Sequence, residues 1–170
     1  MKLLHSKLCL AFAALALPLA ASADALISER QISTDAAIEM AQTALAACRK
    51  HGSLVTITIL DRADRTVLSV RDNGASPHSV EHSLRKAHTA LTYNMSSLEY
   101  GKNAAGNPGS AGTLHLANIT TAAGGLPIRA GDTLVGAIGI SGTPGAKGGG
   151  AADEECAKTA IEKIAGSLAK

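Results

Sequence analysis

The chain has 170 residues, with 16 lysines and arginines against 14 aspartates and glutamates, and only 2% of its residues are aromatic. A nucleic-acid-binding surface usually needs a basic excess and aromatic rings on which bases stack, so this composition argues against a nucleic-acid partner. The length suits one domain with a modest core of leucine, isoleucine, valine and alanine.

The first 23 residues have the pattern of a secretory signal peptide. Lys2 and Lys7 give a positive start, an apolar segment follows over residues 8–20, and a small-residue cleavage site ends at Ala23. The apolar segment is interrupted by a proline and is shorter than the roughly 20 residues that span a bilayer. We therefore expect cleavage after Ala23, a single mature domain over residues 24–170 without a membrane span, and a periplasmic or secreted location.

The first elements of the mature chain are predicted to be a helix and a β-hairpin. Ser33 or Thr34 can cap a helix whose apolar residues recur at three- and four-residue spacing, and Gly52 is a suitable stop. Residues 54–60 alternate apolar side chains with threonine, which predicts a half-buried strand, and residues 66–71 form the second arm of the hairpin.

The segment SPHSVEHSLRKAHTAL, residues 76–91, predicts a second helix that contains three of the six histidines. Pro77 suits its first turn. A helical wheel places most of the apolar side chains on one face, which is predicted to be the core face. These residues are Val80, Leu84, Ala87, Leu91 and Met95.

The three histidines of this helix do not share one face. His78 and His82 lie opposite the predicted core face, beside Arg85 and Lys86, and are expected to face solvent, a surface pocket or another subunit. His88 lies at the edge of the apolar face and is expected to be a partly buried structural residue. Only the first two histidines are therefore placed to share a ligand.

The second half of the chain begins with a long surface excursion rich in glycine and asparagine, over residues 96–119. A strand, a turn and a second strand are predicted within residues 120–142, and a flexible loop covers residues 143–151. A final helix with acidic residues in its first turn is predicted from Asp153. Two hairpins make antiparallel pairs, so the fold class is α+β with helices packed on a sheet.

Two cysteines remain after the predicted signal peptide. Cys48 lies near the end of the first mature helix and Cys156 near the start of the last. If those helices pack antiparallel on one face of the sheet, the two sulfurs meet, and an oxidising compartment favours a disulfide. The alternative is that both cysteines are small buried hydrophobic residues.

Two short motifs suggest other chemistry but lack the context that it requires. Residues 78–82, HSVEH, fit the H-x-x-E-H motif of inverted zinc proteases, yet a third ligand is not identifiable and the chain is short for such an enzyme. Gly136, Gly139 and Gly142 lie three residues apart within and at the end of a strand. Dinucleotide-binding glycines have a different spacing and lie between a strand and a helix.

The sequence resembles the GlcG/HbpS family, whose secreted members are described as haem-binding proteins. The resemblance extends from Ile32 to the end of the chain, and implies a profilin-like α/β/α three-layer domain with a five-stranded antiparallel sheet flanked by helices. It also implies assembly into homo-oligomers, and a fifth strand around residues 119–123 or in an adjoining segment. The segments that carry it are LDRADRTVLSVRDNGASPH, KAHTA, GGLPI, VGAIGISG and DEECAKTAIEKI.

Haem is therefore the cofactor that the resemblance suggests, and the residue chemistry is compatible with it. Haem iron accepts a neutral imidazole, and His78, in the SPH segment, is predicted to be the axial ligand. His82 is predicted to be a secondary ligand or a pocket wall. Arg71, Arg85 and Lys86 are candidate partners of the propionates. Since aromatic walls are scarce, we expect a shallow, exchangeable site.

Two other functions stay open. Some members of the resembled family are encoded beside carbon-utilisation genes, which suggests an enzyme or accessory protein that acts on a small hydroxy- or keto-acid. A catalytic constellation is not recognisable in the sequence, so enzymatic activity is not predicted. The third possibility is a structural oligomer in which the histidine face of the second helix is an interface.

Overall fold

The computed structural model describes residues 25–169, and the predicted signal peptide lies outside the described residues. Labels beginning with η denote 3-10 helices. The elements are α1 (Thr34–Lys50), β1 (Thr56–Asp61), β2 (Thr66–Arg71), α2 (Ser79–Tyr93), α3 (Ser97–Ala105), η1 (Pro108–His115), β3 (Gly125–Ala130), β4 (Thr133–Ser141), η2 (Gly145–Lys147) and α4 (Gly149–Leu168).

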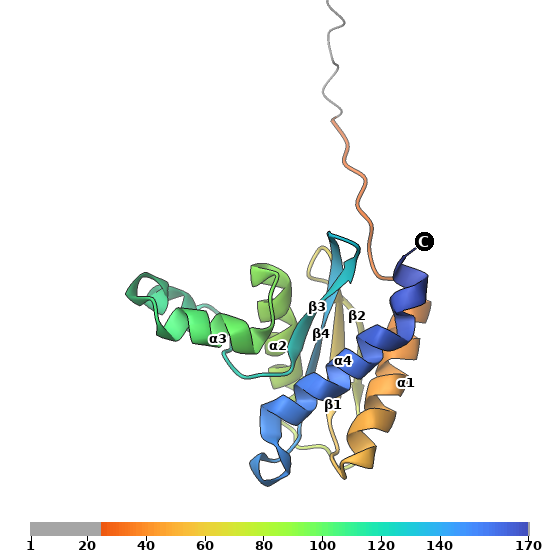
Figure 1. Ribbon diagram of the computed structural model, residues 1–170, viewed down its shortest axis with the longest axis vertical. Coiled ribbons are helices and arrows are strands. Elements are labelled where there is room, and N and C mark those ends of the chain that lie inside the picture. The colour runs from red at the N-terminus through yellow and green to blue at the C-terminus, as the bar shows by residue number, and fades with distance from the viewer. Residues whose placement is uncertain (1–24, 170) are drawn as a thin grey trace, which may run out of the picture.

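The sheet has four antiparallel strands in the order β2-β1-β4-β3. Helices α1 and α4 cover one face and α2 covers the other, so the molecule has three layers (Figure 1). The predicted α+β class is confirmed. Within residues 25–169, no helix is both long and apolar enough to cross a bilayer.

The prediction of a fifth strand at residues 119–123 is wrong. The backbone of this segment forms hydrogen bonds with side chains, and not with the backbone of a neighbouring strand. The amide of Thr120 donates to Thr89 Oγ1 at 2.9 Å, and the carbonyl of Ala122 accepts from Ser97 Oγ at 2.6 Å. The segment therefore forms a loop that leads from the α3–η1 arm to β3.

Helix α1 begins and ends where its sequence signals predict. Ser33 is the N-cap, and its hydroxyl accepts from the amide of Ala36 at 3.2 Å. Gly52 follows the last turn with a φ of 66°, a left-handed conformation that favours glycine. Helix α4 runs antiparallel to α1 on the same face of the sheet (Figure 1), and the structure joins Cys48 to Cys156 with a Cα–Cα distance of 5.7 Å.

Strand β1 is buried along its whole length, so the prediction of a half-buried strand is wrong. Its threonines face α2 and form hydrogen bonds with serines of that helix. Thr56 Oγ1 lies 2.7 Å from Ser79 Oγ, and Thr58 Oγ1 lies 2.8 Å from Ser83 Oγ. These hydroxyl pairs satisfy polar groups that would otherwise be costly to bury.

The face of α2 that packs on the sheet differs from the predicted one. Val80 is 45% exposed and Leu84 is only partly buried, whereas small and polar residues are enclosed. Glycines in β3 and β4 allow α2 to lie close to the sheet, because a Cβ at Gly125 or Gly139 would collide with the backbone of α2. The buried residues of α2 are Ser79, Ser83, Lys86, Ala87, Thr89, Ala90 and Leu91.

Helix α3 and η1 form an arm that projects from the three layers (Figure 1). The rings of Tyr93 and Tyr100 stack at its base, with centroids 4.0 Å apart. The predicted surface excursion is therefore more helical than its composition suggests. Helix α4 starts at Gly149, so Asp153 lies beyond its first turn, contrary to the prediction.

Candidate functional site

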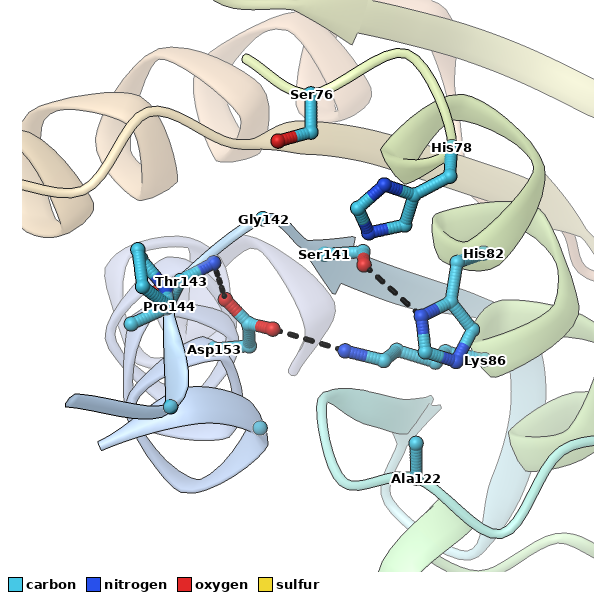
Figure 2. Close-up of a pocket in the computed structure, with 12 residues that line it drawn as sticks. Ser76, His78, His82, Lys86, Ala122, Ser141, Gly142, Thr143, Pro144 and Asp153 are labelled. Atoms are coloured by element: carbon cyan, nitrogen blue, oxygen red, sulfur yellow. Dashed lines mark hydrogen bonds and ion pairs between the residues drawn. The ribbon is translucent and has the colours of Figure 1, made fainter. Parts of the chain in front are cut away.

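A pocket of about 360 Å³ lies where the first turns of α2, the end of β4 and the loop before α4 meet. Figure 2 shows His78 and His82 projecting from α2 toward Ser141 of β4. Lys86 and Asp153 meet deeper in the same pocket (Figure 2). The structure thus brings together three residues that the sequence analysis proposed and two that it did not.

A buried ion pair forms the floor of the pocket. The Lys86 and Asp153 side chains are each 2% exposed, and Lys86 Nζ donates to Asp153 Oδ2 at 2.8 Å. It also donates to the carbonyl of Ile140 at 2.8 Å, while Asp153 Oδ1 accepts from the amide of Thr143 at 3.1 Å. Burial lowers the pKa of Lys86, and the neighbouring carboxylate of Asp153 opposes that shift.

The prediction that Lys86 lies on the exposed polar face of α2 is wrong. Small residues of α2 pack on the sheet, so the helix is rotated relative to the predicted core face. This rotation directs Lys86 inward to Asp153. Lys86 is therefore a buried group bound to Asp153 and to the carbonyl of Ile140, and it is not the exposed cation that the helical wheel predicted.

His82 forms the side wall of the pocket and is partly buried. Its Nδ1 lies 3.2 Å from Ser141 Oγ, and its Nε2 lies 3.3 Å from Thr120 Oγ1. Burial lowers the pKa of His82, and the nearby charges of Lys86 and His78 lower it further. Because both ring nitrogens have hydroxyl partners, His82 suits a pocket wall better than an iron ligand.

The pH titration of His82 tests this description. We expect the pKa of His82 to lie below the ordinary histidine value of about 6.5. The unfolded chain then binds more protons than the folded protein at acid pH, so His82 should reduce stability as the pH falls through about 6.5. The NMR signals of the His82 ring, followed over a pH series, measure its pKa, and a value at or above about 6.5 would contradict its burial.

His78 lies at the mouth of the pocket. It is the residue immediately before α2, it is exposed, and its side chain does not cap the helix. Its ring projects over the pocket near Ser141 (Figure 2). An exposed imidazole at this position is free to approach a flat ligand from the surface.

The two arginines proposed from the sequence occupy different environments. Arg85 is 41% exposed and pairs with Glu81 at 2.6 Å, in a shallow depression that also includes His78 and His82. Arg71 lies apart from this depression, and its Nε donates to the carbonyl of Ala75 at 3.0 Å. Arg71 therefore stabilises the loop that leads to α2.

The third histidine of α2 has a separate structural role. His88 Nδ1 lies 2.7 Å from Asp64 Oδ2, and the His88 side chain is 23% exposed. The predicted partial burial is confirmed, and the contact links α2 to the β1–β2 turn. Among residues 25–169, no group of three or more histidine, cysteine or acidic side chains is arranged to hold a metal ion.

Ser141, Thr143 and Asp153 were not identified as site residues from the sequence. They come from the end of β4, the following loop and α4, and they reach α2 only through the folded topology. The sequence signal that could have indicated them is Ser141-Gly142 at the end of an apolar strand. Gly142 has a φ of 139°, and a Cβ there would lie 2.5 Å from the carbonyl oxygen of Leu54.

The fold and the site define a three-layer α+β domain with a small polar pocket beside the start of α2. A family model described as "Haem degrading protein HbpS-like" matches residues 32–162. The chain therefore belongs to the HbpS-like family. A comparison with curated proteins gives no match.

Solved structures share this fold. A double mutant of HbpS from Streptomyces reticuli is 31% identical, with a TM-score of 0.75, and the match covers 86% of this chain and 96% of that one. The PduOC:heme complex is 25% identical, with a TM-score of 0.70 and coverage of 79% and 95%. Protein ORFY of Klebsiella pneumoniae, at 23% identity, 84% and 97% coverage and a TM-score of 0.75, supports the fold alone.

Proposed function

We propose that this protein is an exported haem-binding protein that sequesters, stores or transfers haem. The observation that carries the proposal is the exposed imidazole of His78 at the mouth of the pocket. Membership of the HbpS-like family and the likeness to a solved PduOC:heme complex support the same ligand class.

The residues around His78 fit haem at a shallow site. His78 would hold the iron, and His82 would form the adjoining wall while it keeps its two hydroxyl partners. Arg85 is a candidate propionate partner, because its side chain is 41% exposed and, within residues 25–169, its ion pair is with the exposed Glu81. Bound haem would supply an iron centre, and the described residues do not define a reaction at it.

Assembly into homo-oligomers belongs to this proposal. The shallow depression beside His78 encloses little of a flat macrocycle, and a second copy of the chain would cover the outer face. Size-exclusion chromatography with light scattering, with and without haemin, measures the assembly. A monomer under both conditions would contradict this part of the proposal.

Haemin titration tests the iron ligand. Wild type should shift the Soret band on binding, and His78→Ala should bind at least about tenfold more weakly, a loss of about 1.4 kcal/mol. The matched control is His51→Ala, because His51 is an exposed histidine at the end of α1, away from the pocket. Unchanged binding by His78→Ala would refute the assignment, and His115 would be the next candidate to test.

Export is tested separately from haem binding. The full chain, expressed in a bacterium with a periplasm, should be recovered from the periplasmic fraction with its mature N-terminus at Asp24. Mass spectrometry of the intact protein measures the cleavage site. Recovery of the uncut chain from the cytoplasm would contradict this part of the proposal.

A further inference from the structure

Two buried residues of the pocket have hydrogen-bond donors that the described residues leave unused. The ammonium group of Lys86 has three N–H donors, and among the described residues it has two acceptors, Asp153 and the carbonyl of Ile140. Thr143 is 9% exposed, and its Oγ1 has no hydrogen-bond partner within residues 25–169. Both residues line the pocket. Buried donors are normally satisfied, so the pair indicates an acceptor that enters from outside the chain.

The pocket that Lys86 and Thr143 line is larger than a single water molecule requires. The pocket holds about 360 Å³, whereas one water occupies about 30 Å³ of liquid. The volume lies within the range of small-molecule sites. Glycine at position 124 lets the backbone lie close to the ion pair, because a Cβ there would lie 3.0 Å from Lys86 Nζ and 2.9 Å from Asp153 Cβ.

The polarity of the pocket favours an anionic acceptor. Helix α4 begins beside the pocket without a side-chain cap, and Gly150 in its first turn lines the pocket. The amides of an uncapped first turn carry a partial positive charge. Asp153 is paired with Lys86 and also accepts from Thr143 N, so the floor of the pocket is neutral as a whole, and the amides of α4 add a partial positive charge to it.

We propose that this pocket binds the carboxylate of a small organic acid, with its two oxygens accepting from Lys86 Nζ and Thr143 Oγ1. The site lies deeper than His78, and the proposal stands independently of haem binding. A carboxylate could also come from a haem propionate. The depth of the pocket and its polar floor favour a free acid of a few carbon atoms.

The first experiment uses haem-free protein labelled with ¹⁵N. Sodium acetate, lactate and pyruvate are added in separate titrations, with acetamide and sodium chloride as neutral and ionic controls. At least one acid should cause saturable shifts of the Thr143, Gly145 and Gly150 amides, at least about tenfold tighter than acetamide. Shifts that do not saturate, or that acetamide or chloride reproduces, would overturn the proposal.

Thr143→Val separates binding from a structural role. Valine keeps the shape of threonine but lacks its hydroxyl. Because that hydroxyl has no hydrogen-bond partner among the described residues, the melting temperature should stay the same or rise. Affinity for the acid should fall about tenfold. Thr66→Val, at an exposed position of β2, is the matched control and should change neither value. A lower melting temperature with unchanged acid affinity would assign the Thr143 hydroxyl a structural role and overturn the proposal.

A competition experiment distinguishes the two sources of carboxylate. Haemin and haemin dimethyl ester, whose propionates are blocked, are added in turn to protein saturated with the bound acid. Retention of the acid with both compounds supports an independent site. Displacement by haemin alone would assign the pocket to a propionate, and displacement by both would place the macrocycle over the pocket. Either displacement overturns the free-acid assignment, whereas failure of haemin to bind at all leaves acid binding intact.

Discussion

Replacing Cys48 and Cys156 together with alanine is expected to lower the free energy of unfolding by about 2–5 kcal/mol. The two residues are 108 positions apart, and closing a loop of about 100 residues removes roughly 4.7 kcal/mol of chain entropy from the unfolded state. Both side chains are buried between α1 and α4, at 0% and 1% exposure. The disulfide therefore restricts most of the unfolded chain, and it is buried in the folded protein.

Urea denaturation of oxidised wild type and the double variant measures this effect. Wild type incubated with a reductant under denaturing conditions and then refolded is the control, and it should approach the stability of the variant. Oxidised mature wild type, which lacks Cys9, should contain no free thiol when thiols are counted in denaturant. Two free thiols per chain, or equal denaturation midpoints for wild type and variant, would contradict a stabilising disulfide.

The elements whose signals are local could be predicted from the sequence. The Ser33 cap and the Gly52 stop define α1, and the alternating pattern places the first hairpin within a few residues of its observed bounds. The pattern of turns also indicated four strands, as observed, whereas the resemblance led to the expectation of a fifth. Residues 119–123 lack a neighbouring strand because side chains bind their backbone.

The orientation of α2 could not be predicted from its apolar residues. A helical wheel assumes that the buried face is the apolar one, but this helix buries serines that hydrogen-bond to the threonines of β1. Its close approach also depends on Gly125 and Gly139 in strands far along the chain. A pattern within one helix contains no information about such partners.

The same limit explains which site residues were found. His78 and His82 lie in one conspicuous segment, so the sequence alone indicated them. Ser141 lies 59 residues from His82, and Asp153 lies 67 residues from Lys86, so only the folded topology brings each pair together. Because the sequence did not indicate Asp153 as the partner of Lys86, the helical wheel predicted that Lys86 was an exposed cation.

Lys86→Met is expected to lower the free energy of unfolding by about 3–5 kcal/mol, because it leaves the carboxylate of Asp153 buried without its counter-charge. Urea denaturation at neutral pH measures the loss. Lys158→Met is the matched control. Lys158 is 50% exposed and lies 3.7 Å from the partly buried Glu154 and 3.9 Å from the exposed Glu155, and the loss of such long pairs with an exposed cation typically costs under about 1 kcal/mol.

The double variant Lys86→Met/Asp153→Leu separates the loss of pairing from the loss of packing. It removes both charges and keeps apolar volume in the interior, so it should be more stable than Lys86→Met alone. It should not recover fully, because the carbonyl of Ile140 and the amide of Thr143 each lose a hydrogen-bond partner. If the double variant were less stable than Lys86→Met, Asp153 would stabilise the loop before α4 mainly through Thr143. If Lys86→Met cost no more than Lys158→Met, water would have to reach the ion pair, and the floor of the pocket would be more open than the 2% exposure of Lys86 indicates.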